Sequence, residues 1–262
     1  GSVIVPITPS NATMGGQQGD KGIIKTESGT FVVEDTVKVV GTRYAHVGYV
    51  SEGMIRTGEK ATLSVDTKTR TNTCRNHSAT HLLQKALREV LGTHVEQAGS
   101  YQDAERTRFD FSHFSAMTAE ELKRVEDIVN EKINEAIEVH TDIMTVDEAK
   151  KTGAMALFGE KYGEKVRVVS MGDFSKEFCG GTHVKNTSDI KVFKILSESG
   201  VAAGVRRIEA ITGDNVFAYY SNMEKELEEA AKVVKSTPAN LKERLEHLMA
   251  EMQALQSENE SL

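Results

Sequence analysis

The sequence lacks the features that mark secreted and membrane-spanning proteins. Its 262 residues contain two cysteines, Cys74 and Cys179, and a single pair does not make the disulfide framework of a secreted scaffold. No run approaches the ~20 apolar residues that span a bilayer. The opening residues, GSVIVP, have neither the basic nor the long apolar region of a secretory signal. We therefore expect a cytoplasmic protein with reduced thiols and no membrane partner.

An excess of basic charge is also missing. The formal net charge is −7, so no global positive field of the kind typical of nucleic-acid-binding domains is present. The segment from Ser221 onward carries nine acidic and five basic residues, which leaves −3 for the rest of the chain and room for a local basic face. There is no G-x-S-x-G elbow and no P-loop, which removes the two commonest hydrolase and nucleotide-binding signatures.

What is present predicts an α+β fold in three parts. Residues 1–70 contain β-rich stretches separated by glycine turns, such as FVVEDTVKVV and ATLSVD, and predict a partial small β-barrel that we expect to be truncated. Residues 71–212 alternate helical segments with pairs of strands, without βαβ regularity. Residues 213–262 are helical and acidic.

Helix boundaries can be predicted from capping residues. Asn76 as N-cap and Gly92 as the first residue beyond the end predict one helix. Thr118 with Glu121 forms a capping box that predicts a second. A short third helix is expected to start at Thr145, with Glu148 three residues on, and to end at Gly153.

A heptad pattern marks the end of the sequence. After Pro238 a seam recurs in steps of four and three, with Asn259 in one slot and apolar residues at Leu241, Leu245, Leu248, Met252, Leu255 and Leu262. Such a seam is typical of a coiled coil. We expect one helix there, packed either on the helix before Pro238 or on a partner chain such as a second copy in a homodimer.

Two short motifs place metal-binding side chains at fixed spacing. His77 and His81 are about 40° apart on an ideal helix, on a face that lacks the leucines of that segment. Cys179 and His183 flank Gly180-Gly181-Thr182, where the glycines disfavour a helix and favour a tight turn. We expect the four side chains to converge on one metal ion, and three nitrogens with one sulfur suit zinc.

Cys74 is a rival ligand. It lies three residues before His77, on the same turn if the helix begins early. The alternative interpretation, which we favour, is an ordinary small packed residue.

Several longer motifs resemble one family. NHSATHLL, GTHVEQAGS, RFDFSH, GAMALFGEKYGEKVRVVSMGDFSKEFCGGTH and SESGVAAGVRRIEAITG are similar to the editing domain of bacterial alanyl-tRNA synthetase. The resemblance runs from Gly15 to Gly213, and the zinc pattern is shared with threonyl-tRNA synthetase editing domains and free-standing alanyl editing proteins. One departure is Ser10-Asn11, which stands where the family has an aromatic pair, so we place no site residue there.

The resemblance implies a zinc-dependent aminoacyl-tRNA deacylase. Its partner would be the acceptor end of alanine tRNA mischarged with serine or glycine, since a pocket built for alanine cannot exclude either strongly. It implies a β-barrel-like domain at 1–70, an editing domain at 71–212 and a helical segment at 213–262 that leads to a further C-terminal domain. We expect no aminoacylation core in this chain.

The resemblance also assigns site residues. It maps one zinc ion onto His77, His81, Cys179 and His183, a pocket glutamine onto Gln97, and the pocket floor onto Thr80.

Four further residues are candidate tRNA contacts. Gly15 and Gly16 belong to a glycine loop, and Arg206 and Arg207 to a predicted strand. Because successive strand residues point to opposite faces, at most one of the arginines can contact a given phosphate.

Three alternatives stay open at this point. The chain could be a free-standing alanyl editing protein, a tRNA-binding module with structural zinc and no hydrolysis, or an unrelated zinc hydrolase. The last would need a glutamate base, and none is obvious beside the histidines.

Overall fold

The computed structural model describes residues 1–157 and 161–261. Contacts divide the chain into two compact units, Gly1–Gly213 and Asp214–Leu262. Residues 158–160, part of the long motif that starts at Gly153, lie outside the described residues. The first unit combines antiparallel sheets with helices and the second is helical, which confirms the α+β class. The finer domain boundary at residue 70 stays a prediction.

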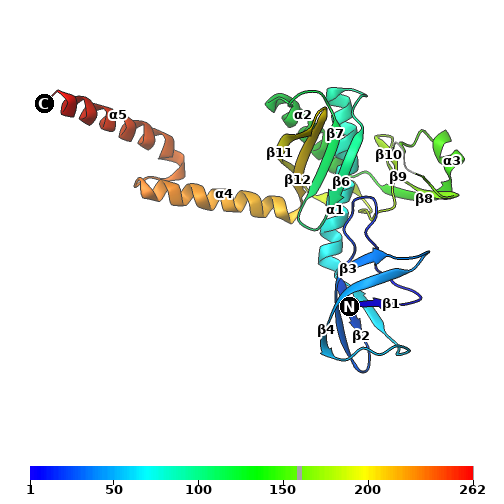
Figure 1. Ribbon diagram of the computed structural model, residues 1–262. Coiled ribbons are helices and arrows are strands. Elements are labelled where there is room, and N and C mark those ends of the chain that lie inside the picture. The colour runs from blue at the N-terminus through cyan, green and yellow to red at the C-terminus, as the bar shows by residue number, and fades with distance from the viewer. Residues whose placement is uncertain (158–160, 262) are drawn as a thin grey trace. The chain divides into compact units, whose positions relative to one another are not determined.

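A five-stranded antiparallel sheet forms the N-terminal part of the first unit (Figure 1). Its order is β1-β4-β3-β2-β5, with β1 (Ser2–Ile4), β2 (Gly22–Lys25), β3 (Gly29–Lys38), β4 (Tyr44–Gly53) and β5 (Thr62–Val65). Among the described residues β1 and β5 remain edges, each with one partner strand, so the sheet is open and no closed barrel forms. Ile24, Phe31 and Val33 make its small core.

The helix α1 (Thr67–Leu91) begins ten residues earlier than an N-cap at Asn76 predicted. Asp66 is the N-cap, and its side chain accepts from Thr69 N. Asn76 instead lies inside the helix, fully buried, where its amide donates to Asp103 O at 2.8 Å and accepts from Thr212 Oγ1 at 2.6 Å. The predicted N-cap was therefore wrong, because Asn76 finds its hydrogen bonds in tertiary contacts.

A four-stranded antiparallel sheet packs with α1 and α2 to form the main core (Figure 1). Its order is β11-β12-β7-β6, with β6 (Gln97–Gln102), β7 (Thr107–Ser112), β11 (Phe193–Ala202) and β12 (Val205–Thr212), and α2 spans Ala119–Asn134. Alternate residues of β7, including Phe109 and Phe111, are buried against Leu82 and Leu83 of α1. This burial holds the histidine-bearing turns of α1 in place.

A smaller sheet carries the cysteine motif. It has the order β10-β9-β8, with β8 (Val139–Thr145), β9 (Lys165–Met171) and β10 (Ser175–Phe178), and α3 (Val146–Lys151) follows β8. The capping boxes at Thr118 and Thr145 are both present, as predicted. A 3-10 turn, η1 (Thr187–Ile190), connects this region back to β11.

The second unit contains α4 (Asp214–Val233), the 3-10 turn η2 (Pro238–Asn240) and α5 (Leu241–Glu260). The predicted single helix after Pro238 is confirmed. Much of its seam is exposed, since Met252 and Leu255 are 61% and 65% accessible, so the packing of the seam on another helix stays a prediction. No helix in the described part of the chain is both long enough and apolar enough to cross a membrane.

Candidate metal centre

The four side chains that the two motifs single out come together. His77 and His81 project from neighbouring turns of α1, and Cys179 and His183 come from the segment after β10. One ligand atom from each lies within 4.8 Å of all the others. The predicted convergence is confirmed, across more than a hundred residues of intervening sequence.

Three of the distances between these atoms are close to the edges of a tetrahedral shell. His81 Nε2 lies 3.0 Å from His183 Nε2, and Cys179 Sγ lies 3.3 Å from His77 Nε2 and 3.5 Å from His183 Nε2. Metal–nitrogen bonds of about 2.0–2.1 Å and a metal–sulfur bond of about 2.3 Å give tetrahedral edges of about 3.4 and 3.6 Å. The set can therefore hold a metal ion, and its donor chemistry is consistent with zinc.

Both glycines of the cysteine motif are closely packed, and the buried neighbours of Gly181 leave no room for a side chain there. A Cβ on Gly181 would overlap the imidazole of His77 and lie 2.7 Å from Gln17 Oε1, and a Cβ on Gly180 would overlap the sulfur of Met14. Arg167 donates to both glycine carbonyls at 3.1 Å. The segment is thus a bend pinned by its backbone, and no helix forms there.

Burial and neighbouring groups set the protonation of the ligands. Burial would raise the pKa of the Cys179 thiol, but His77 and His81 lower it well below its ordinary value. Burial lowers the pKa of His183 to about 3. Thiolate and neutral imidazole are the forms that bind metal, so these two residues are ready to bind near neutral pH.

Glu177 is a site residue that the sequence did not reveal. It is buried, and its Oε1 lies 3.3 Å from Nδ1 of His81. Burial would lower the pKa of His81, but Glu177 and Cys179 together raise it well above its ordinary value. A carboxylate on the outer nitrogen of a ligating histidine is a common device for orienting the ring. The sequence did carry a signal for Glu177. It lies two residues before Cys179, and residues two apart in an extended segment point to the same side.

A cavity of about 480 Å³ opens beside the four ligands. Gln97, Thr80 and Gly15 line it, as do four basic residues: Lys38, Lys161, Lys165 and Arg167. Gln97 lies at a β-bulge between β6 and β7, and bulges often redirect side chains beside active sites. The structure thus brings the two predicted pocket residues to the same cavity as the metal set.

Thr80 and Gln97 differ in their hydrogen bonds. The Thr80 hydroxyl is buried, donates to Asn76 O at 2.8 Å and contacts Thr107 Oγ1 at 2.6 Å. Within the described residues the amide of Gln97 has no recorded hydrogen bond, so it remains available to a ligand in the cavity.

Cys74 is outside the metal set of the described residues. Its thiol donates to Thr182 Oγ1 at 3.1 Å, and burial raises its pKa. Both cysteines are free. Cys74 therefore supports the motif that carries Cys179 and His183 from the opposite side.

The two candidate arginines are engaged in ion pairs. Arg206 pairs with Glu198, and Arg207 binds Asp110 through two contacts of 2.7 and 2.9 Å. Gly16 accepts a hydrogen bond from Gln102 N at 2.9 Å. A tRNA contact by the two arginines, Gly15 or Gly16 remains a prediction.

Comparison with known proteins decides the family. A model of the threonyl and alanyl tRNA synthetase second additional domain matches residues 166–209, and a model of class II (A) tRNA synthetases matches residues 1–69. The whole chain is 60% identical to alanine–tRNA ligase 1 of Lachnoclostridium phytofermentans and 50% identical to alanine–tRNA ligase of Cupriavidus necator. The chain belongs to the alanyl-tRNA synthetase family. It covers 30% of the length of each of these two alanyl-tRNA synthetases.

Proposed function

We propose that this chain is the proofreading part of an alanine–tRNA ligase. Its reaction is hydrolysis of the ester that joins serine or glycine to the 3′ end of alanine tRNA. The observation that carries the proposal is the juxtaposition of the His77, His81, Cys179 and His183 set with a 480 Å³ cavity. A sequence match along the whole chain to alanine–tRNA ligases supports this origin over a free-standing editing protein.

A purely structural zinc site is the competing function. A closed shell with no adjacent pocket would favour it, since structural sites need no access for substrate. Here three of the four ligands, His77, His81 and Cys179, line the cavity, which favours chemistry at the centre. The deciding assay is hydrolysis of Ser-, Gly- and Ala-charged alanine tRNA: we expect the first two to be cleaved and the third spared, whereas the structural alternative predicts that none is cleaved.

The residues of the cavity have separate tasks. Zinc held by the four ligands would either lower the pKa of a water or anchor the amino group of the substrate. Thr80 shapes the floor, because its hydroxyl already donates to Asn76 O. Lys38, Lys161 and Lys165 supply positive charge at the cavity, where the phosphates of a tRNA end would lie.

Gln97 is the residue that recognises the seryl hydroxyl in this proposal. Its amide can donate to and accept from that group, whereas glycine offers no hydroxyl. We expect Gln97→His to slow Ser-tRNA hydrolysis about tenfold, the loss of roughly one net hydrogen bond of 1.4 kcal/mol, with a smaller change for Gly-tRNA. Parallel metal analysis should find zinc still bound. Wild-type hydrolysis of Ser-tRNA, or loss of zinc, would show that Gln97 is not a pocket residue.

We also propose that the seam of α5 packs on a second helix, in a second copy of the chain or elsewhere in this one. The exposed Leu245, Met252 and Leu255 motivate it. We expect sedimentation velocity to show a dimer that Leu255→Lys dissociates and Gln256→Lys leaves intact. If the protein is a monomer at all concentrations, the dimer alternative is wrong, and only packing of the seam on a helix of the same chain remains.

A further inference from the structure

Gln17 is a buried glutamine that connects the N-terminal region to the metal set. It lies in the loop between β1 and β2 and has no accessible surface. The loop pairs with the edge of β6, since Gln18 N donates to Gln102 O at 2.8 Å and Gln102 N donates to Gly16 O at 2.9 Å. A Cβ on Gly16 would overlap the carbonyl of Ser100, so this close pairing requires glycine there.

The amide of Gln17 makes three contacts around the metal set. Its Oε1 accepts from Thr182 N at 2.8 Å and contacts His77 Nδ1 at 2.7 Å, and its Nε2 donates to Thr182 Oγ1 at 2.7 Å. A backbone N–H can only donate, so the atom that faces both groups is the amide oxygen. His77 Nδ1 must then carry the proton, and the lone pair of Nε2 points toward Cys179.

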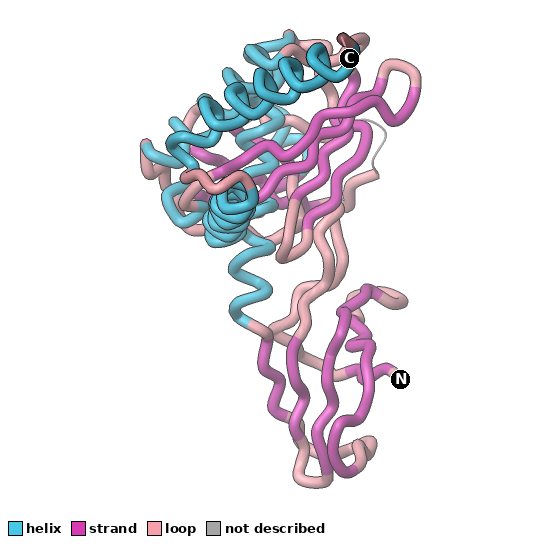
Figure 2. Tube along the Cα trace, turned by 90° about the vertical axis from the view of Figure 1, so that its left-hand side faces the viewer, coloured by secondary structure: helices cyan, strands magenta, loops and turns pink. Residues whose placement is uncertain are grey.

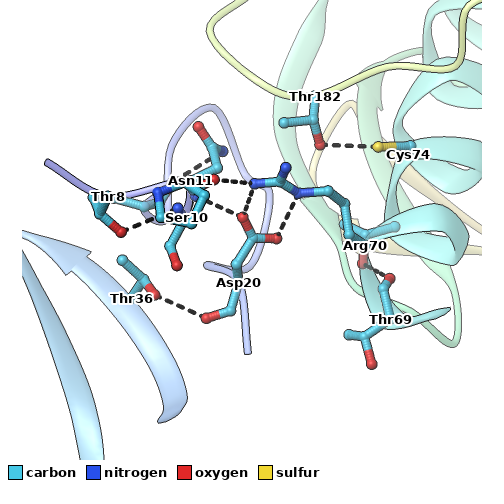
Figure 3. A network of polar contacts seen from close by, with 12 residues as sticks. Thr8, Ser10, Asn11, Asp20, Thr36, Thr69, Arg70, Cys74 and Thr182 are labelled. Carbon is cyan, nitrogen blue, oxygen red and sulfur yellow. Dashed lines mark hydrogen bonds and ion pairs between the residues drawn. The ribbon is translucent and has the colours of Figure 1, made fainter. Parts of the chain in front are cut away.

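The loop that carries Gln17 also contacts the first turn of α1, which lies further from the ligands, through Arg70 (Figure 3). Arg70 forms an ion pair with Asp20 and donates to Pro9 O at 2.8 Å. Asp20 also accepts from Asn11 N at 2.6 Å. Figure 2 shows extended segments running beside the first turns of α1 between the N-terminal sheet and the rest of the unit.

Two contacts therefore meet at Thr182, between the ligands Cys179 and His183. Gln17 donates to its hydroxyl from the N-terminal loop. Cys74 donates to the same atom from α1 (Figure 3). Through Thr182 and His77, one amide side chain fixes parts of both ligand pairs relative to each other.

We propose that Gln17 is a positioning residue of the metal centre, which selects the Nδ1–H tautomer of His77 and sets the Cys179–His183 bend at ligand distance. The N-terminal loop is thus part of the site. The proposal rests on the metal centre of the proposed function, but its test measures metal binding and does not require that the chain hydrolyse any substrate.

Two substitutions separate this role from simple packing. Gln17→Met has a similar size but cannot accept from His77 or Thr182, whereas Gln17→Glu keeps the acceptor. Loss of an oriented partner of a metal ligand typically weakens metal binding about 10–100-fold. We expect zinc affinity to fall about 10–100-fold in Gln17→Met. In Gln17→Glu we expect it to stay within about threefold of the parent, because a carboxylate fills the same accepting role. Packing alone predicts the reverse order, since it penalises the buried charge.

The measurements are competition with a zinc chelator and the visible spectrum of the cobalt-substituted protein, with Gln18→Met as the matched control. The control should bind as the parent does. Parent-like affinity of Gln17→Met, or equal weakening by Gln17→Glu, would overturn the proposal. If Gln17→Met does not fold, the ¹⁵N spectrum of the zinc-bound parent still decides: a proton on Nδ1 of His77 is expected, and a proton on its Nε2 would contradict it.

Discussion

Replacing Cys179 with alanine should remove zinc from the protein and abolish hydrolysis of Ser-tRNA and Gly-tRNA alike. Cys179 Sγ lies 3.3 Å from His77 Nε2 and 3.5 Å from His183 Nε2, so its loss removes one of the four metal ligands. Its pKa is held low by His77 and His81 against the effect of burial, and no other described thiol belongs to the set. We expect substoichiometric zinc by mass spectrometry and hydrolysis reduced at least a hundredfold.

Cys74→Ala is the matched control for this result. The Cys74 thiol lies outside the metal set and only donates to Thr182. It should retain one zinc per chain and most of the hydrolysis. Zinc retained by Cys179→Ala and lost by Cys74→Ala would reverse the assignment of the sulfur ligand.

Gly181→Ala should weaken zinc binding at least tenfold without touching a ligand. The added methyl would occupy space now filled by the His77 ring, and it would lie 2.7 Å from Gln17 Oε1. Both neighbours are buried, so neither can move aside without displacing Nε2 from the shell.

Gly163→Ala tests the steric argument, because a Cβ there meets nothing within 4 Å although the residue lines the same cavity. Circular dichroism should show a native fold in both variants. Zinc titration should show weakened binding only in Gly181→Ala. Equal affinity in the two proteins would mean that the bend tolerates a side chain and that the glycine is not needed for the metal set.

The sequence predicted the parts of the site that local spacing determines. His77 and His81 are one helical turn apart, and Cys179 and His183 flank a two-glycine bend, so each pair is visible in a short window. Gln17 and Glu177 were not assigned roles. Gln17 reaches His77 across 60 residues of sequence, and its place depends on pairing of its loop with β6, which no local pattern encodes.

The error at the start of α1 has the same origin. Asn76 has the residue type of an N-cap, but its partners are Asp103 and Thr212 in the folded core, and Asp66 provides the cap. The β-rich N-terminal segment was expected to form part of a barrel, and it forms an open five-stranded sheet whose edge strands β1 and β5 have three and four residues. Strand closure depends on long-range pairing, whereas alternation within a strand reports only which face is buried.

The most direct test of the central claim is to titrate the metal-free chain with zinc while following hydrolysis of serine-charged alanine tRNA. We expect the rate to rise in proportion to bound zinc and to reach its plateau at one equivalent, with alanine-charged tRNA left intact. Hydrolysis by the metal-free protein, or one tightly bound zinc with no hydrolysis, would contradict it.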